Sequence, residues 1–264
     1  MDGKVKVALC QTYIEWEDKE TNITSAEGYI KQAAENGAEL ILFPEMSFTG
    51  FSMDISVTRE SDPYTIERMK EFAVRYKAAI GFGWVHAVGD KAENRYCILD
   101  HEGRILADYS KIHSFRYGGE CDQFVSGNVI SSFEYKGLKF TPFICYDLRV
   151  PEIFRAVNDD TDVYIVPANW PARRSMHWKT LLQARAIENQ AYVLGINCAG
   201  SIGELEYSGD SSAIAPDGTV MDMISDREGI IFVDIDRSVL GIRDSFPVLE
   251  DRKKDLYSRL GGSV

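Results

Sequence analysis

The sequence predicts an α/β protein built as a four-layer α-β-β-α sandwich, in which two mixed sheets pack together and helices cover them outside. Three observations predict this class. Short apolar runs of strand length alternate with amphipathic stretches of helix length. The order of these segments in the first half of the chain recurs in the second half. Hairpin turns that contain Gly103 and Gly218 occupy matching places in the two halves.

The first half supplies one sheet and its helices. The strands expected from short apolar runs are 5–10, 40–43, 79–85 and a hairpin pair, 97–99 and 104–106. Two helices are expected between them because apolar residues recur at helical spacing. Asn22 is the expected cap of the first, which Gly37 closes, and the second covers 65–77.

The second half repeats this plan. The expected strands are 140–144, 163–167, 192–197 and the hairpin pair 213–214 and 220–221, and the expected helices are 151–157 and 176–190. No linker, charge block or low-complexity segment divides the chain, so we expect one domain over 1–264. Its last stretch, 242–264, is polar and is expected to be a C-terminal extension that packs on a neighbour or stays loose.

Bulk composition excludes several classes of protein. The 264 residues carry a net charge of −12, which repels nucleic acid and anionic membrane surfaces. The five cysteines form no disulfide or zinc framework, and the four histidines lack metal-ligand spacing. No signal-peptide core or membrane-spanning run is present, and Gly81-Phe82-Gly83 is too short to cradle a phosphate. We therefore expect a soluble cytoplasmic protein without cofactor or metal.

Three polar residues stand out because each follows an apolar run. Glu45 follows the strand 40–43, Lys111 follows the strand of the first hairpin, and Cys145 follows the strand 140–144. Strand ends in an α/β protein face one crevice, so a carboxylate, an ammonium and a thiol should converge there. Pro151 opens a helix shortly after Cys145, and the nearby positive end of that helix favours a thiolate. Such a trio is suited to hydrolysis through a cysteine nucleophile.

The chain resembles the carbon–nitrogen hydrolase (nitrilase) superfamily. The matching segments are Leu42–Met46 with Thr49–Phe51, Tyr109–Phe115, and Ile144–Glu152. The resemblance implies a nitrilase-like sandwich, a homodimer, and a catalytic triad of Glu45, Lys111 and Cys145. It also implies a second glutamate downstream of the lysine, for which Glu120 is the candidate and Asp122 the alternative.

Within the superfamily the chain is most similar to the bacterial omega-amidase-like branch, through segments 167–172, 174–178, 184–192 and 207–211. The Cys-Trp-Glu run of true nitrilases is absent, because Tyr146 and Asp147 follow Cys145. The resemblance implies hydrolysis of the terminal amide of a small carboxylate-bearing substrate, such as 2-oxoglutaramate or 2-oxosuccinamate. A cysteine thioester would form and ammonia would be released.

The remaining site residues are assigned by their place near strand ends. The backbone N–H of Tyr146 is expected to help hold the oxyanion. Candidates for substrate binding are Phe48, Asn169, Trp170, Arg173 and Arg174. The arginines would grip the substrate carboxylate, although a solvated pair next to a helix is equally compatible with the sequence. The aromatic residues could equally belong to the core.

Two other functions stay open at this point. The chain could be another amidase of the superfamily that acts on N-carbamoyl amines or aliphatic amides, with the same catalytic residues and a different pocket. It could also be a non-catalytic, ligand-binding relative. Against the second reading, an acid, a base and a thiol are costly to keep buried together without use.

Overall fold

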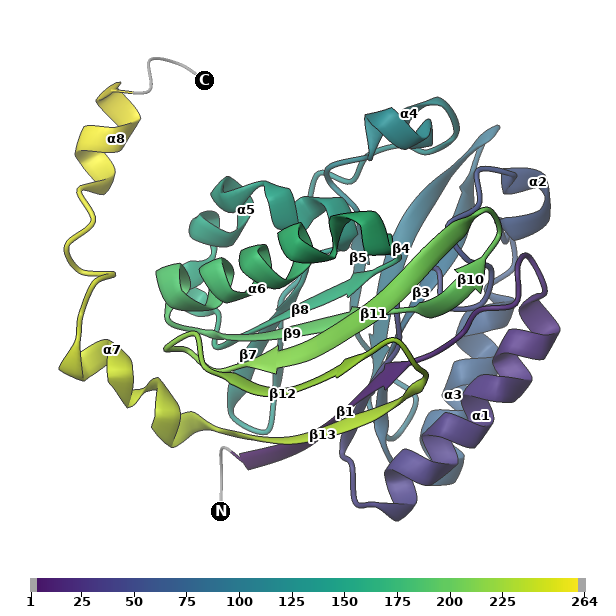
Figure 1. Cartoon of the computed structure of the whole chain (residues 1–264), viewed down its shortest axis with the longest axis horizontal. Coiled ribbons are helices and arrows are strands. Elements are labelled where there is room, and N and C mark those ends of the chain that lie inside the picture. Colours follow the sequence, from purple (N-terminus) through teal and green to yellow (C-terminus); the bar gives the residue numbers. More distant parts are fainter. Residues whose placement is uncertain (1–3, 261–264) are drawn as a thin grey trace.

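Two mixed β-sheets packed face to face form the centre of the computed structural model, which describes residues 4–260 (Figure 1). Within these residues, the first sheet contains, in spatial order, β13 (Gly229–Asp236), β1 (Lys4–Gln11), β2 (Leu40–Leu42), β3 (Ala79–Val88), β4 (Lys91–Leu99) and β5 (Ile105–Ser110). The second contains β10 (Ala199–Ile202), β11 (Leu205–Ile214), β9 (Tyr192–Asn197), β8 (Val163–Ala168), β7 (Leu138–Pro142) and β6 (Phe133–Tyr135), with β12 (Val220–Ser225) paired to β11.

Helices cover the outer faces of both sheets. The first sheet carries α1 (Lys19–Glu35) and α3 (Tyr64–Tyr76), and the second carries α5 (Pro151–Ala156) and α6 (Ser175–Asn189) (Figure 1). The shorter helices are α2 (Ile55–Thr58), α4 (Glu120–Gln123), α7 (Ile242–Ser245) and α8 (Lys254–Leu260), with 3₁₀ turns η1 (Arg116–Gly118), η2 (Cys145–Arg149), η3 (Asn158–Asp160), η4 (Ala172–Arg174) and η5 (Arg237–Gly241). The predicted four-layer sandwich is confirmed. None of the described helices is long and apolar enough to cross a bilayer.

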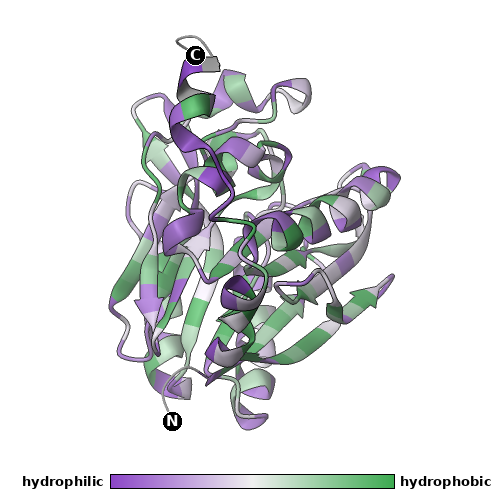
Figure 2. Ribbon diagram, turned by 90° about the vertical axis from the view of Figure 1, so that its left-hand side faces the viewer, coloured by the Kyte–Doolittle hydropathy of each residue, from purple (hydrophilic) through white to green (hydrophobic). Residues whose placement is uncertain are grey.

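The central strands of each sheet are parallel and buried on both faces. β1, β2 and β3 run parallel, and β7, β8 and β9 repeat that arrangement in the second sheet. Along β1, Val7 and Leu9 enter the core between the sheets, while Ala8 and Cys10 pack under the helices. This alternation follows from the two-residue period of a strand. Figure 2 shows the resulting concentration of hydrophobic residues in the strands.

Several boundaries differ from the predicted ones. α1 begins at Lys19, and its N-cap is Asp18, whose side chain accepts a hydrogen bond from the Thr21 N–H. The predicted cap, Asn22, is buried inside the helix and donates from Nδ2 to the Phe48 carbonyl at 2.9 Å. The strands β6, β10 and β13 were not predicted. β13 pairs antiparallel with β1 along the whole length of β1. The apolar run in β13 could have predicted this strand from the sequence.

The segment after β13 leaves the sandwich and runs along its edge, drawn in yellow in Figure 1. Arg243 anchors it by donating to the backbone carbonyls of Gln190 and Thr161 at 2.9 and 2.7 Å. Arg252 donates to Asn158 Oδ1 at 2.6 Å. Part of the predicted extension 242–264 therefore binds its own chain, and residues 261–264 lie outside the described range. The division into one domain with an extension stays a prediction.

Candidate active site

The three polar residues that follow strand ends lie together between the two sheets. Glu45 follows β2, Lys111 follows β5, and Cys145 opens η2 two residues after β7. Lys111 Nζ donates to Glu45 Oε1 at 2.9 Å, and the Glu45 carboxylate is also hydrogen-bonded to the Cys145 thiol. Glu45 is fully buried and Lys111 is 2% exposed. The convergence expected from the strand ends is present in the structure.

The turn that carries Glu45 depends on a glycine in the neighbouring strand. Gly83 of β3 lies so close that a Cβ there would be 2.2 Å from the backbone nitrogen of Met46. Ser47 fastens the turn, because its backbone N–H donates to the Gly83 carbonyl at 3.1 Å and its Oγ accepts from the Gly83 N–H at 2.8 Å. The carboxylate of Glu45 is therefore fixed by the sheet itself.

Lys111 is held between two carboxylates. Its Nζ donates to both oxygens of Glu120, at 3.0 and 2.9 Å, as well as to Glu45. Burial alone would lower the pKa of the ammonium, but Coulombic attraction by Glu120 and Glu45 outweighs it and raises that pKa. Lys111 therefore stays positively charged. Of the two candidates for the second glutamate, Glu120 is buried against Lys111, whereas Asp122 is exposed.

Cys145 sits on a strained turn. Its φ of 48° is in the left-handed region, which a non-glycine residue adopts only where the surroundings hold it. Asp147 provides this restraint, because its Oδ2 accepts from the Ile144 N–H at 3.0 Å and its N–H donates to the Ile144 carbonyl at 3.0 Å. The turn is thus closed by one buried side chain.

Asp147 also ties the cysteine turn to the lysine segment. It accepts a hydrogen bond from the Tyr109 hydroxyl at 2.8 Å and from the His113 backbone N–H at 2.9 Å. His113 Nδ1 lies 2.8 Å from the same carboxylate. The hydrogen bond to Asp147 raises the pKa of His113, against a smaller opposing effect of burial. Asp147 therefore holds the turn of Cys145 against the segment that carries Lys111.

The position of Cys145 in the sequence favours a thiolate, whereas its surroundings in the structure favour the neutral thiol. Burial raises the pKa of its thiol well above the ordinary value, and the Glu45 carboxylate raises it further. Lys111 acts in the opposite direction but does not compensate. The cysteine is the first residue of η2, six residues before α5 begins at Pro151. The Glu45 carboxylate is therefore placed to accept the proton of the Cys145 thiol.

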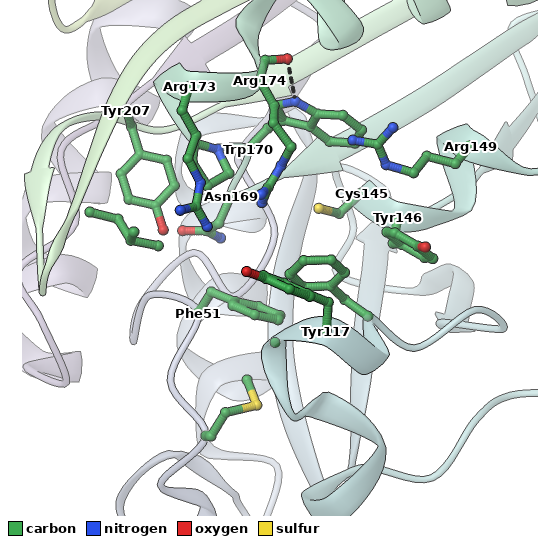
Figure 3. Close-up of a pocket in the computed structure, with 15 residues that line it drawn as sticks. Phe51, Tyr117, Cys145, Tyr146, Arg149, Asn169, Trp170, Arg173, Arg174 and Tyr207 are labelled. Atoms are coloured by element: carbon green, nitrogen blue, oxygen red, sulfur yellow. Dashed lines mark hydrogen bonds between the residues drawn. The ribbon is translucent and has the colours of Figure 1, made fainter.

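Cys145 opens into a pocket of about 300 Å³ (Figure 3). The residues that line it come from β11 and from the segments that follow strands of both sheets: Phe51, Met53, Phe115, Tyr117, Gly118, Cys145, Tyr146, Arg149, Asn169, Trp170, Pro171, Arg173, Arg174, Leu205 and Tyr207. In Figure 3, Arg173, Arg174 and Trp170 lie on the upper side, Phe51 and Tyr117 on the lower side, and the sulfur of Cys145 between them. The volume suits a small molecule.

Three arginines give the pocket a strong positive charge. The Arg149 guanidinium stacks 4.5 Å from the Trp170 ring centre, and that of Arg174 lies 5.3 Å from the Phe115 ring centre. Burial, followed by repulsion from Arg173 and Arg149, lowers the pKa of Arg174. Within residues 4–260, none of the three forms an ion pair with a carboxylate. The pocket can therefore accept an anionic group from outside.

The substrate-binding candidates divide into two groups. Asn169, Trp170, Arg173 and Arg174 line the pocket, and so does Tyr146, the candidate for the oxyanion N–H. Asn169 also supports the carboxylate directly, since its backbone N–H donates to Glu45 Oε2 at 2.9 Å.

Phe48 was predicted to bind substrate, but it does not line this pocket. It is buried in the core under α1 and α3, with its ring 6.4 Å from that of Phe43 and 6.2 Å from that of Phe82. Phe51, three residues on, supplies the pocket wall instead. Sequence reasoning also missed Arg149, which stands four residues after Cys145 on the same 3₁₀ turn.

Comparison with known proteins places this geometry among hydrolases. The sequence profile described as carbon-nitrogen hydrolase matches residues 6–242. The chain is 34% identical over 260 residues to 2-oxoglutaramate amidase of Bacillus subtilis, which covers 96% of this chain and 100% of that protein. It is 33% identical over 251 residues to the omega-amidase YafV of Escherichia coli, with 94% and 96% covered.

A solved structure is similar over nearly the whole chain. It is a CN-hydrolase superfamily protein of Xanthomonas campestris with an arsenic adduct in its active site. The TM-score is 0.90 at 31% sequence identity, and the match covers 95% of this chain and 97% of that one. The sandwich described above is therefore the fold of that superfamily.

Proposed function

Because the chain belongs to the carbon-nitrogen hydrolase family, we propose that it hydrolyses the terminal amide of a small carboxylate-bearing amide, as an omega-amidase does. The substrates proposed are of the 2-oxoglutaramate or 2-oxosuccinamate type. The observation that carries this choice is the set of arginines 149, 173 and 174, which line the Cys145 pocket without carboxylate partners among residues 4–260. A substrate carboxylate would neutralise them, and arginine binds carboxylates through two parallel hydrogen bonds.

The proposed reaction begins with a proton transfer. Glu45 takes the proton of the Cys145 thiol as the sulfur attacks the amide carbon, so no resting thiolate is required. The Lys111 ammonium and the backbone N–H of Tyr146 stabilise the oxyanion that forms. Loss of one such donor typically costs about 3–4 kcal/mol of transition-state stabilisation.

The second half of the reaction returns the enzyme to its starting state. Protonated Glu45 gives its proton to the leaving nitrogen, the carbon–nitrogen bond breaks, and ammonia departs from a thioester on Cys145. Glu45 then takes a proton from water, which attacks the thioester and releases the carboxylic acid, and the sulfur recovers the proton. Glu120 holds Lys111 in place throughout, through its two contacts with Nζ.

An ammonia-release screen tests this proposal. The substrates are 2-oxoglutaramate, 2-oxosuccinamate, an uncharged aliphatic amide of similar length, and an N-carbamoyl amine. We expect turnover of the two carboxylate-bearing amides and a much lower rate with the others. Cys145→Ala should abolish turnover while near-ultraviolet circular dichroism stays unchanged. Equal rates with charged and uncharged amides would contradict the proposed specificity, and activity of Cys145→Ala would contradict the mechanism.

We also propose that the protein is a cytoplasmic homodimer. All five cysteines are free, which suits a reducing compartment. Ile187 on α6 and Phe246 after α7 are 54% and 64% exposed and line a second cavity, which offers an apolar surface for a second copy. Sedimentation velocity at micromolar concentration tests the dimer, and a single monomer species would argue against it.

A further inference from the structure

Asn94 touches every charged member of the proposed catalytic group. It lies on β4 and is 1% exposed. Its Nδ2 donates to Glu45 Oε1 at 2.7 Å and to Glu120 Oε1 at 3.0 Å. Its backbone carbonyl accepts from the Lys111 N–H at 2.9 Å. No other residue in the described range combines these three contacts.

We propose that Asn94 is a positioning residue that holds Glu45 and Glu120 side by side as proton acceptors and thereby sets the pH at which Glu45 works as the base. This inference rests on the proposed function, in which Glu45 accepts the Cys145 proton. Asn94 does not line the pocket, so it acts through the carboxylates and not on the substrate.

The donor count explains why a neutral amide is needed. An ammonium has three N–H donors, and Lys111 directs them to Glu45 Oε1 and to both oxygens of Glu120. One positive charge therefore faces two carboxylates. The two N–H groups of Asn94 add one further donor to each carboxylate without adding charge.

Removing this amide would change proton occupancy. Without it, the Lys111 ammonium and one backbone N–H on each carboxylate, from Asn169 on Glu45 and from Phe115 on Glu120, are the remaining donors. With fewer donors the two carboxylates more readily share a proton, because like charges at close range disfavour double ionisation. A proton shared between Glu45 and Glu120 would prevent Glu45 from accepting the proton of Cys145. The other titratable groups around Glu45 are Cys145, Cys198 and Tyr207, and the carboxylate raises the pKa of all three, second to burial for the two thiols. A higher pKa favours the neutral form of each of these groups, which adds no charge beside Glu45.

A second observation separates this role from a contribution to stability. The Oδ1 atom of Asn94 is buried and has no hydrogen-bond partner among the described residues. A buried acceptor without a partner opposes folding. The side chain is therefore satisfied only on the side that faces the two carboxylates, which is the arrangement expected where function determines the residue.

The test compares Asn94→Ala and Asn94→Ser with the natural protein. The control is Asn189→Ala on α6, because Asn189 is also fully buried, also donates from Nδ2 and also has an unpartnered Oδ1 within the described residues. Two pH profiles are measured: kcat with 2-oxoglutaramate, and the rate of Cys145 alkylation by iodoacetamide, followed by peptide mass. The second needs no substrate.

We expect kcat to fall by about 10- to 100-fold in both Asn94 variants, since small displacements of catalytic groups have effects of this size. KM should change by less than about twofold, because the pocket is untouched. The acid limb of both profiles should move to higher pH by about one unit. Asn189→Ala should leave both profiles in place.

Several results would overturn the inference. The inference is wrong if the acid limbs of the Asn94 variants coincide with those of the natural protein, even if kcat falls. Unfolding of both Asn94 variants under conditions where Asn189→Ala folds would make the role structural. If the natural protein hydrolyses no amide, the proposed function fails by itself, and the alkylation profiles still decide whether Asn94 sets the proton occupancy of Glu45.

Discussion

The positive pocket offers the sharpest test of substrate recognition, and Arg174 is the residue to change first. Its guanidinium interacts electrostatically with Arg173, Arg149 and Cys145. Arg174→Met removes the charge but keeps a long apolar stem that can pack on the Phe115 ring. Its effect therefore reports on charge more than on packing.

The expected size of the effect follows from the surroundings of Arg174. A hydrogen bond to a charged group contributes about 1.5–3 kcal/mol, which corresponds to about 10- to 150-fold in kcat/KM for a carboxylate-bearing amide. The loss should not be complete, because Arg149 and Arg173 remain in the pocket. For an uncharged amide the rate should stay within about threefold, since no carboxylate is bound.

The assay is ammonia release from 2-oxoglutaramate and from an uncharged amide of equal length, with kcat/KM measured for each. Arg155→Met is a matched control, because Arg155 lies outside this pocket and likewise forms no carboxylate ion pair among residues 4–260. Arg149→Met and Arg173→Met complete the series. If all three pocket variants keep the natural preference for the charged amide, the carboxylate clamp does not exist. An equal loss with both substrates would show that the arginines act on structure.

Two further predictions concern the scaffold of the site. Because the Asp147 hydrogen bond raises the pKa of His113 above the ordinary 6.5, the pair should stabilise the fold fully below that pH, and the effect should vanish as pH rises through the folded-state pKa. Urea unfolding of His113→Gln and the natural protein should therefore differ more at pH 5.5 than at pH 8.5, and a constant difference would contradict the sign. Gly83→Ala should destabilise the fold by about 1–3 kcal/mol and lower kcat, because its Cβ would meet the backbone of Met46. A variant with unchanged kcat and thermal midpoint would show that the close approach is not required.

The three candidates for the catalytic triad share one property, which is a position shortly after a buried strand. Glu45, Lys111 and Cys145 could be proposed because strand ends in an α/β fold meet at one edge. Asn94 could not, because it lies in the middle of β4, where an asparagine reads as a polar residue on a sheet face. Its contacts arise only when the folded first sheet brings the segments after β2 and β5, and α4, next to β4.

The errors have a common cause in side-chain direction. Phe48 and Phe51 stand in the same turn, and their sequence neighbourhood does not tell which one faces the helices and which one the pocket. Arg149 was overlooked because its distance from Cys145 in the chain gives no information until η2 turns both toward the cavity. Asn22 was predicted as the cap because it precedes the apolar pattern. The helix begins one turn earlier, where the side chain of Asp18 accepts a hydrogen bond from the free N–H of Thr21. Tertiary packing decided the outcomes for Phe48, Phe51 and Arg149, and a local hydrogen bond decided the cap.

The resting protonation of Cys145 has a consequence for how this site avoids unwanted chemistry. A thiolate in an arginine-rich pocket would be exposed to any electrophile that enters, whereas a thiol held by Glu45 reacts only when a base removes its proton. Burial is the main cause that raises the pKa of the thiol, and the adjacent carboxylate raises it further. In the proposed mechanism that same carboxylate accepts the proton during attack. The cost of forming the anion is then met only when an amide carbon is in place and Lys111 can stabilise the charge that moves onto its oxygen. On this argument, alkylation of Cys145 by iodoacetamide should be slow in the resting protein near neutral pH, and fast labelling comparable to that of an activated thiolate would contradict the proposed order of steps.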